Sequence, residues 1–238
     1  MIKIVDRPHF PFFNRAASRM AEAIDKTAEA ITASGCTMTM ATGPWIAGGS
    51  VLAAITLDTS SDIDVFFRTV DDVNRVVRHF IRQGYMDDGE ETADSGGHHD
   101  DGGTPFSPGI VHTFATPWGK VNIAALLLWP SVEELLGHFD ITVAQVAYAG
   151  DEVILTEEAE EDIAAKRLRT TCETGIHRVR KYVAKGYSLD TEEDRLALAA
   201  GTPVLWKWSL DRTLTTRLRE VEAKRREAAA APTDDIPW

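Results

Sequence analysis

Cysteine is scarce in this sequence, and long apolar runs are missing. Its 238 residues include two cysteines, Cys36 and Cys172, and no Cys-x-x-Cys pair. Two thiols cannot build a disulfide framework or the usual zinc site, so both are expected to be free thiols in a reducing cytoplasm. The longest apolar run, Ile123–Pro130, is shorter than the roughly 20 residues that a membrane helix needs. Asp6 stands where a signal peptide would be apolar, so a cytoplasmic protein that does not contact a membrane is predicted.

Positive charge is also scarce. The 25 Lys and Arg residues face 37 Asp and Glu residues, which gives a net charge of −12. This net negative charge argues against a protein whose whole surface binds nucleic acid. The charge is uneven, however, because Met86–Gly103 is strongly acidic while Ala164–Tyr187 has seven Lys and Arg against the single acid Glu173. An acidic total can therefore hide one basic face.

Helix and strand patterns alternate over the first part of the chain. Apolar residues at helical spacing predict helices over 11–33 (capped by Asn14), 51–55, 71–83, 131–138 and 140–149. Alternating or continuous apolar runs predict strands at 37–41, 62–67, 110–114, 120–128 and 152–155. The segment 86–109 is poor in apolar residues and is predicted to be a long loop.

From Thr156 onward the pattern predicts helices alone, at 157–169, 172–185, 191–200 and 203–231. The predicted fold class is therefore α+β, with a small mixed-sheet head followed by a helical lobe. We expect the α/β head to span 1–150, the helical lobe to span 151–231 and an acidic C-terminal tail to span 232–238.

Two aspartates and a glycine turn form the pattern with the clearest chemistry. Asp62 and Asp64 lie two apart on a predicted strand, so their carboxylates leave the same face. Two such charges repel unless a cation lies between them, and Mg²⁺ prefers hard oxygen ligands of this kind. Upstream, Gly48 and Gly49 precede Ser50 at the start of a predicted helix, where backbone N–H groups can approach a phosphate. Together these residues suit metal-assisted transfer of a phosphoryl group.

An Asp-x-Asp pair also occurs where neither acid binds anything. In that alternative Asp62 flanks the strand start and Asp64 is a solvated edge residue. The nearby Gly-Ser pair and the apolar residues between the acids favour the functional interpretation.

The run Gly49-Ser50, eleven residues, then Asp62-Ile63-Asp64-Val65 resembles the signature of the nucleotidyltransferase superfamily, which includes DNA polymerase β, poly(A) polymerases and CCA-adding enzymes. The segment Phe139–Tyr148 is similar to a second motif of the CCA-adding and bacterial poly(A) polymerase heads. Arg178-x-x-Lys181-Tyr182-x-x-x-Gly186-Tyr187 resembles a segment that follows this head in phage and large-virus relatives. The resemblance to the nucleotidyltransferase head covers about residues 44–150, and the segment at 178–187 lies beyond it. It implies a mixed-sheet head, two Mg²⁺ (or Mn²⁺) ions, and transfer of a nucleoside monophosphate from an NTP with loss of pyrophosphate.

The sequence departs from this family at the position of a third carboxylate. The corresponding strand offers Asn122, a neutral and weaker metal ligand. Asp140 is the obvious substitute, although the resemblance more readily gives it a nucleotide-contacting or structural role. The arginine motifs that select CTP and ATP in CCA-adding enzymes are not recognisable, so CCA addition is not predicted.

Other polar residues carry weaker signals. Arg178, Lys181 and Lys185 share one helix face and could bind a triphosphate or an RNA backbone, or simply be solvated. The run His98-His99-Asp100-Asp101 could bind a metal, but neighbouring residues of an acidic glycine-rich loop rarely converge on one ion. Trp129, Trp206 and Trp208 are expected to pack in the core.

The tail Asp234-Asp235-Ile236-Pro237-Trp238 resembles the acidic tip of bacterial single-stranded DNA-binding proteins, with Trp in place of their final Phe. Such a tip docks an apolar terminal side chain in a partner's pocket while its acids meet basic residues. The alternative is a frayed acidic tail.

The first hypothesis is a nucleotidyltransferase with Asp62 and Asp64 as catalytic and metal-binding residues. Gly48, Gly49, Ser50, Asp140, Arg178 and Lys181 would bind the nucleotide. Its acceptor would be a hydroxyl of RNA (including tRNA), protein or a small molecule. The second hypothesis is a catalytically degenerate relative, an adaptor that docks on a replication or repair protein through its tail. In either case the protein is expected in the cytoplasm, which would be that of a host cell if a phage encodes it.

Overall fold

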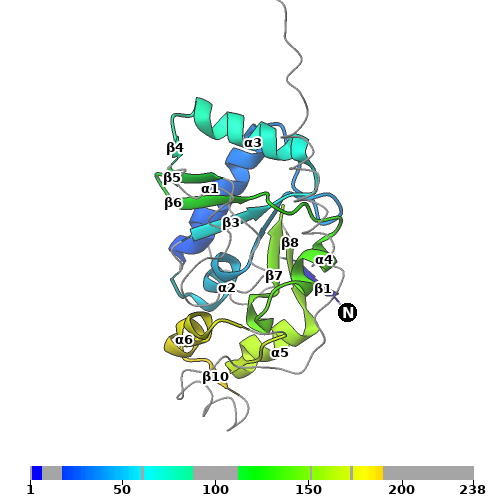
Figure 1. The fold of residues 1–238 in the computed structure, drawn as a ribbon, viewed down its shortest axis with the longest axis vertical. Coiled ribbons are helices and arrows are strands. Elements are labelled where there is room, and N and C mark those ends of the chain that lie inside the picture. Colours follow the sequence, from blue (N-terminus) through cyan, green and yellow to red (C-terminus); the bar gives the residue numbers. More distant parts are fainter. Residues whose placement is uncertain are drawn as a thin grey trace, which may run out of the picture. The chain divides into compact units, whose positions relative to one another are not determined.

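An eight-stranded mixed sheet forms the centre of the fold (Figure 1). Its strand order is β1-β8-β7-β2-β3-β6-β5-β4, and β3 and β6 are parallel while every other neighbouring pair is antiparallel. The strands are β1 (Ile2–Asp6), β2 (Trp45–Ala47), β3 (Asp62–Phe66), β4 (Met86–Asp87), β5 (His112–Thr116), β6 (Gly119–Ala124), β7 (Val146–Ala149) and β8 (Glu152–Thr156). The predicted α+β class is confirmed by this mixed sheet and its helices.

The structure is a computed structural model that describes residues 2–6, 18–59, 62–87, 112–150, 152–171 and 174–189. The chain divides into the units Met1–Trp208 and Ser209–Trp238, and all of the described residues belong to the first. The predicted helices at 191–200 and 203–231, most of the predicted loop at 86–109, and the tail lie outside the described residues. None of the helices in the described ranges has the length and apolar character needed to cross a membrane.

Three helices share a hydrophobic core with one face of the sheet. They are α1 (Arg19–Ala33), α2 (Gly49–Thr56) and α3 (Val70–Arg82). Ile63 and Val65 of β3 lie in this core, whereas Asp62 and Asp64 alternate with them and so leave the opposite face. α1 begins at Arg19 because the Ser18 hydroxyl accepts a hydrogen bond from the backbone N–H of Ala21 (3.2 Å). Asn14, the cap expected from the sequence, lies outside the described residues.

The remaining described elements follow β6 in the sequence and make up most of the C-terminal part of the described chain. They are α4 (Val132–Gly137), the 3₁₀ turn η3 (Thr142–Ala144), α5 (Glu157–Ala165), β9 (Arg167–Leu168), α6 (Ile176–Ala184) and β10 (Ser188–Leu189). β9 contacts α5, η3, α6 and β10, so these elements form one contiguous group (Figure 1). Ser131 caps α4 through the backbone N–H of Glu134 (3.3 Å), as its sequence predicted.

Several predicted elements differ in the structure. The helix predicted over 140–149 is wrong: it is replaced by η3 and by β7, which pairs between β2 and β8. A fully buried strand has a continuous apolar sequence, which periodicity cannot tell from a short helix. The strand predicted at 37–41 is instead a turn closed by backbone hydrogen bonds between Thr39 and Gly43. The chain after Thr156 is not purely helical, because β9 and β10 pair there. β8 also extends the sheet past residue 150, the predicted end of the head.

Candidate nucleotide and metal site

Strand register places the aspartate pair beside the glycine turn. Asp64 is paired with Ala47 of β2 on one side and with Asn122 of β6 on the other. The turn Gly48-Gly49-Ser50 directly follows Ala47, and α2 begins at Gly49. The carboxylates of Asp62 and Asp64 therefore leave one face of the sheet next to the N-terminus of α2. The juxtaposition expected from sequence is present.

A chain of hydrogen bonds fixes the Asp64 side chain. The amide Nδ2 of Asn122 donates to Asp64 Oδ1 (2.8 Å), and the Thr113 hydroxyl donates to Asn122 Oδ1 (3.0 Å). Asn122 of β6 and Thr113 of β5 lie directly opposite each other on these antiparallel strands. The position expected to carry a third acid thus holds a buried amide that orients an existing acid.

The environment of Asp64 raises the pKa of its carboxyl above the ordinary value. Burial is the largest cause, because removal from water disfavours the charged form, and the charge of Asp62 adds to it. The hydrogen bond from Asn122 and the positive charges of Lys181 and Arg178 act in the opposite direction. A cation bound beside Asp64 would favour its ionised form, so the site is suited to binding one.

The N-terminus of α2 has polar groups that could bind an anion. Gly48 occupies the cap position with φ 83° and ψ −139°, and no side chain among the described residues caps the helix. The Ser50 hydroxyl is fully buried and has no hydrogen-bond partner in the described structure. Unpaired N–H groups and an unused hydroxyl at a helix start are what a phosphate group needs.

The Gly48 backbone provides a test of this turn. We expect Gly48→Ala to lower the free energy of unfolding by about 2 kcal/mol, because its backbone conformation belongs essentially to glycine. In addition, a Cβ at Gly48 would lie 2.9 Å from Cε1 of Phe139. Thermal unfolding measures the loss. Gly137→Ala is the matched control, since a Cβ there meets no atom within 4 Å. Equal melting temperatures for the two variants would contradict the role given to this turn.

An ion pair with one buried partner joins the segment between α4 and η3 to α6. Arg178 Nη2 is 2.8 Å from Asp140 Oδ1, and Asp140 is only 4% exposed. Burial raises the pKa of the Asp140 carboxyl, and the charge of Arg178 opposes that rise. The second carboxylate oxygen, Oδ2, is buried without a hydrogen-bond partner in the described structure. This oxygen can still accept a hydrogen bond from a ligand hydroxyl or amino group.

Helix α6 contributes positive charge to the same place. Arg178 and Lys181 are close enough to lower the pKa of Asp64, as noted above. Tyr182 lies among them, and burial raises its pKa to about 12, with the charges of Asp140 and Asp64 adding to the rise. Lys185 points elsewhere: its Nζ lies 3.3 Å from Asp58 Oδ2 and donates to the Thr59 carbonyl (2.9 Å). The acids Asp64 and Asp140, the cations Arg178 and Lys181, and the neutral Tyr182 thus influence one another electrostatically.

The donor set fits a divalent cation held jointly with a nucleotide. No cluster of three or more His, Cys, Asp or Glu occurs in the described part of the chain, and the carboxylates that leave this face of β3 are Asp62 and Asp64. Mg²⁺ is commonly bound by one or two carboxylates together with substrate phosphates and water. These two side chains therefore suit Mg²⁺ bound together with a nucleotide.

Most of the predicted site residues lie within this region. The structure brings Gly48, Gly49, Ser50, Asp62 and Asp64 together by strand register, and it joins Asp140, Arg178 and Lys181 to them through α6. The run at residues 98–101, which the sequence analysis considered but did not favour as a metal site, and the docking tail 234–238 lie outside the described residues. Sequence analysis missed Thr113, for which only strand pairing gives a signal, and it named Tyr182 only as part of a motif.

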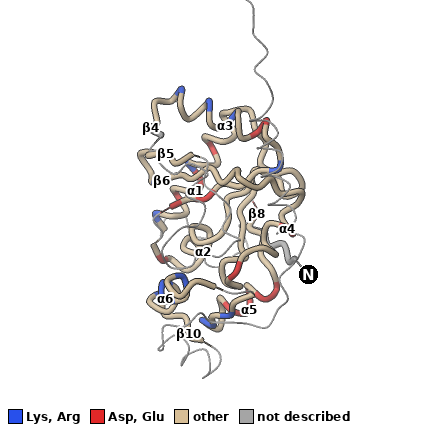
Figure 2. Tube along the Cα trace, in the orientation of Figure 1, with Lys and Arg blue, Asp and Glu red and all other residues tan. Residues whose placement is uncertain are grey.

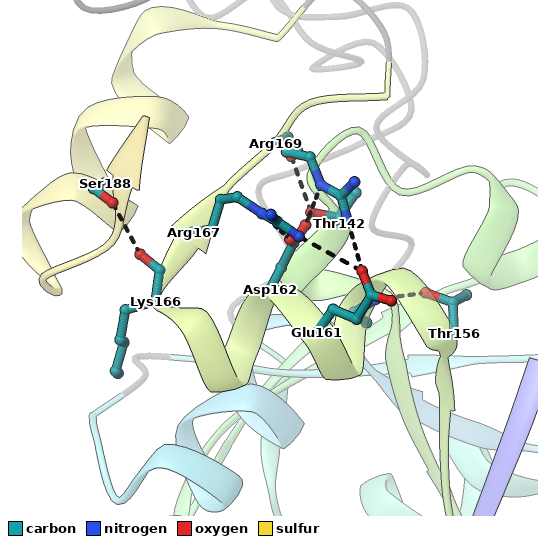
Figure 3. A network of polar contacts seen from close by, with 9 residues as sticks. Thr142, Thr156, Glu161, Asp162, Lys166, Arg167, Arg169 and Ser188 are labelled. Atoms are coloured by element: carbon teal, nitrogen blue, oxygen red, sulfur yellow. Dashed lines mark hydrogen bonds and ion pairs between the residues drawn. The ribbon is translucent and has the colours of Figure 1, made fainter. Parts of the chain in front are cut away.

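A second polar network, also missed from sequence, supports this site (Figure 3). The fully buried Asp162 of α5 accepts hydrogen bonds from Arg167 Nε (2.6 Å) and Arg169 Nε (2.7 Å). It also accepts one from the hydroxyl of Thr142 (2.5 Å), in the turn that follows Asp140. Glu161 lies at the exposed rim, 3.6 Å and 3.9 Å from the two guanidinium groups. The network thereby ties the Asp140 segment to α5 and β9.

Comparison with known proteins identifies a family. Residues 13–166 match Gad2, described as "Gabija anti-defense 2 family protein", and this is more than half of the 238 residues. The chain belongs to this family. The matched region of this Gad2 family member contains the glycine turn, Asp62, Asp64, Asn122 and Asp140, and it ends before α6. A search of curated proteins gave no match.

Solved structures similar to this Gad2 family member are tRNA-processing enzymes. The Thermotoga maritima CCA-adding enzyme complexed with tRNA is 11% identical, with a TM-score of 0.48 over 83% of this chain and 45% of that one. A tRNA nucleotidyltransferase with a primer tRNA and an ATP analog is 14% identical (TM-score 0.47, 66% and 46%). A CCA-adding enzyme with CTP is 12% identical (TM-score 0.49, 94% and 51%). The chain spans about half the length of these structures.

Proposed function

We propose that this Gad2 family member is a metal-dependent nucleotidyltransferase that transfers a nucleoside monophosphate from an NTP to a hydroxyl acceptor. The observation that carries the proposal is the register Ala47–Asp64–Asn122, which sets the open N-terminus of α2 beside the paired carboxylates. Bound Mg²⁺ (or Mn²⁺) would neutralise phosphate charge there as a Lewis acid.

Each part of the site has a role in this proposal. Asp62 and Asp64 hold the cation. The N–H groups at Gly49 and Ser50, with the Ser50 hydroxyl, bind the donor phosphates. Asp140 Oδ2 accepts a hydrogen bond from the nucleotide, while Arg178 and Lys181 contribute positive charge toward the triphosphate.

The reaction needs no redox partner. A bond forms between the acceptor oxygen and the α-phosphorus, and the bond from the α-phosphorus to the bridging oxygen of the β-phosphate breaks. Pyrophosphate leaves, and the hydroxyl proton passes to solvent. Asn122 carries no carboxylate that could take this proton, so the chain supplies no dedicated base at that position.

The family description supplies a context for the acceptor. It names a role against a defence called Gabija. We propose that the chain acts in a host cytoplasm, as a phage-encoded protein would, and that its acceptor is an RNA, protein or small molecule connected with that defence.

Asn122 favours a second candidate function. A neutral residue in place of a third acid suits a degenerate head that binds a nucleotide without transferring it. Such a protein would act as an adaptor, with Asp234–Trp238 docking on a partner that recognises acidic tips with an apolar end.

Labelling separates the two candidates. The protein is incubated with each NTP labelled at the α-phosphate, together with total RNA, total protein and Gabija components. We expect one acceptor to gain label in the presence of Mg²⁺ and to gain none with Asp62→Asn. Thermal stabilisation by Mg²⁺-NTP that disappears in Asp62→Asn, without label in any acceptor, would instead favour the adaptor.

A further inference from the structure

Asn122 has a fixed orientation beside the candidate metal site. It is 2% exposed and lies between Thr113 and Asp64 on neighbouring strands. The Thr113 hydroxyl donates to the amide oxygen (3.0 Å), so the amide nitrogen faces Asp64 Oδ1 (2.8 Å). Turning the amide over would set its oxygen against a carboxylate oxygen at that distance, which is repulsive. The side of Asn122 that faces Asp64 therefore presents hydrogens and no ligand atom.

The charged residues on this face of the sheet also bear on the number of cations that the site can hold. Asp62 and Asp64 are its two carboxylates, and Lys120 is paired with Asp62 on the neighbouring strand, on the same side of the sheet. Arg178 and Lys181 also act electrostatically on Asp64. Two carboxylates are a ligand set that suits one Mg²⁺ held together with substrate phosphates.

We propose that the site binds a single divalent cation with its nucleotide, and that Asn122 sets this number by holding Asp64 Oδ1 in an amide hydrogen bond. This inference rests on the proposed function, which supplies the nucleotide.

One consequence concerns the balance between binding and transfer. In a two-ion site the cations stabilise both the entering and the leaving oxygen of the displacement. With a single ion, one of these two oxygens would be stabilised only by water and side chains. The nucleotide then binds well while transfer is slow. Asn122→Asp replaces the amide by a carboxylate of the same shape and creates the missing ligand.

The experiment counts Mn²⁺ ions by electron paramagnetic resonance on the full chain saturated with an ATP or CTP analogue that has a methylene between the α- and β-phosphorus. We expect one bound Mn²⁺ per bound nucleotide in the wild type and two in Asn122→Asp. Asn74→Asp is the matched control: it makes the same chemical change at an exposed position of α3, and it should keep one ion.

Thermal unfolding gives a second readout that does not depend on activity. Asn122→Asp places a third carboxylate beside Asp64, so it should melt below the wild type in EDTA. It should also gain more than the wild type when Mn²⁺ and the analogue are added. This comparison still decides the question if the variant is only marginally folded.

The outcomes separate the two proposals. Two ions per nucleotide in the wild type, or one in Asn122→Asp, overturn the inference and leave the proposed function standing. A wild type that binds neither Mn²⁺ nor nucleotide overturns both.

Discussion

Asp64→Asn is expected to abolish function while making the protein more stable. Nucleotide transfer should fall on the order of 10³-fold, as when other groups that stabilise developing charge are removed. The melting temperature without metal should rise by about 2–4 °C, which corresponds to about 1 kcal/mol for a domain of this size. Asn keeps the size of the side chain and can still accept the hydrogen bond from Asn122.

The gain in stability follows from the raised pKa of Asp64. Because burial raises this pKa in the folded state, the folded protein binds the proton more tightly than the unfolded chain does. The free energy of unfolding therefore falls as pH rises from the ordinary aspartate value through the raised one. Above that window the ionised carboxylate is a constant cost, which Asp64→Asn removes.

The measurement is thermal unfolding in EDTA across this pH window, followed by titration with Mg²⁺ and NTP. The wild type should lose stability as pH rises through the window, and Asp64→Asn should lose less. Metal and nucleotide should stabilise only the wild type. Glu29→Gln, at an exposed position of α1, controls for the loss of one negative charge. A variant that melts below the wild type in EDTA at neutral pH would refute the account of Asp64.

The sequence was enough to predict the core of this site, because that core depends on local spacing. Asp62 and Asp64 share a face through the two-residue period of a strand, and Gly48–Ser50 can only be a turn entering a helix. The pairing of Ala47 with Asp64 was not predictable from these segments alone, since Trp45–Ala47 is too short to show a strand pattern. The resemblance to known nucleotidyltransferases implied only that the turn and the two aspartates belong to one site.

Contacts between distant segments explain what sequence analysis missed. Thr113 is significant only because β5 pairs with β6 in the register that sets it against Asn122. The helix predicted over 140–149 failed for a similar reason: all four residues of β7 are buried, so both faces of this strand are covered and its sequence is apolar throughout. Arg178 was recognised as cationic, but its pairing with Asp140 depends on the packing of α6.

The buried carboxylate of Asp162 is expected to stabilise the fold more than the exposed carboxylate of Glu161 does. Asp162→Ala should lower the free energy of unfolding by about 3 kcal/mol, because removal of a buried partner leaves charged groups without compensation. The side chain is fully buried and accepts from Arg167, Arg169 and Thr142. Figure 2 shows acidic residues of α5 beside basic ones in this part of the molecule.

Glu161→Ala is the matched control for this prediction. Glu161 contacts the same two arginines, at 3.6 Å and 3.9 Å, but its side chain is 68% exposed. Exposed ion pairs contribute about 0–1 kcal/mol, so this variant should melt close to the wild type.

Thr142 links the network to the nucleotide site, because it lies two residues after Asp140 in the chain. Its backbone N–H donates a hydrogen bond to the Arg169 carbonyl (3.1 Å). Asp162→Ala should therefore also weaken nucleotide binding, measured as a smaller thermal shift with Mg²⁺ and NTP. If Asp162→Ala destabilises no more than Glu161→Ala, the buried carboxylate does not hold the Asp140 segment in place.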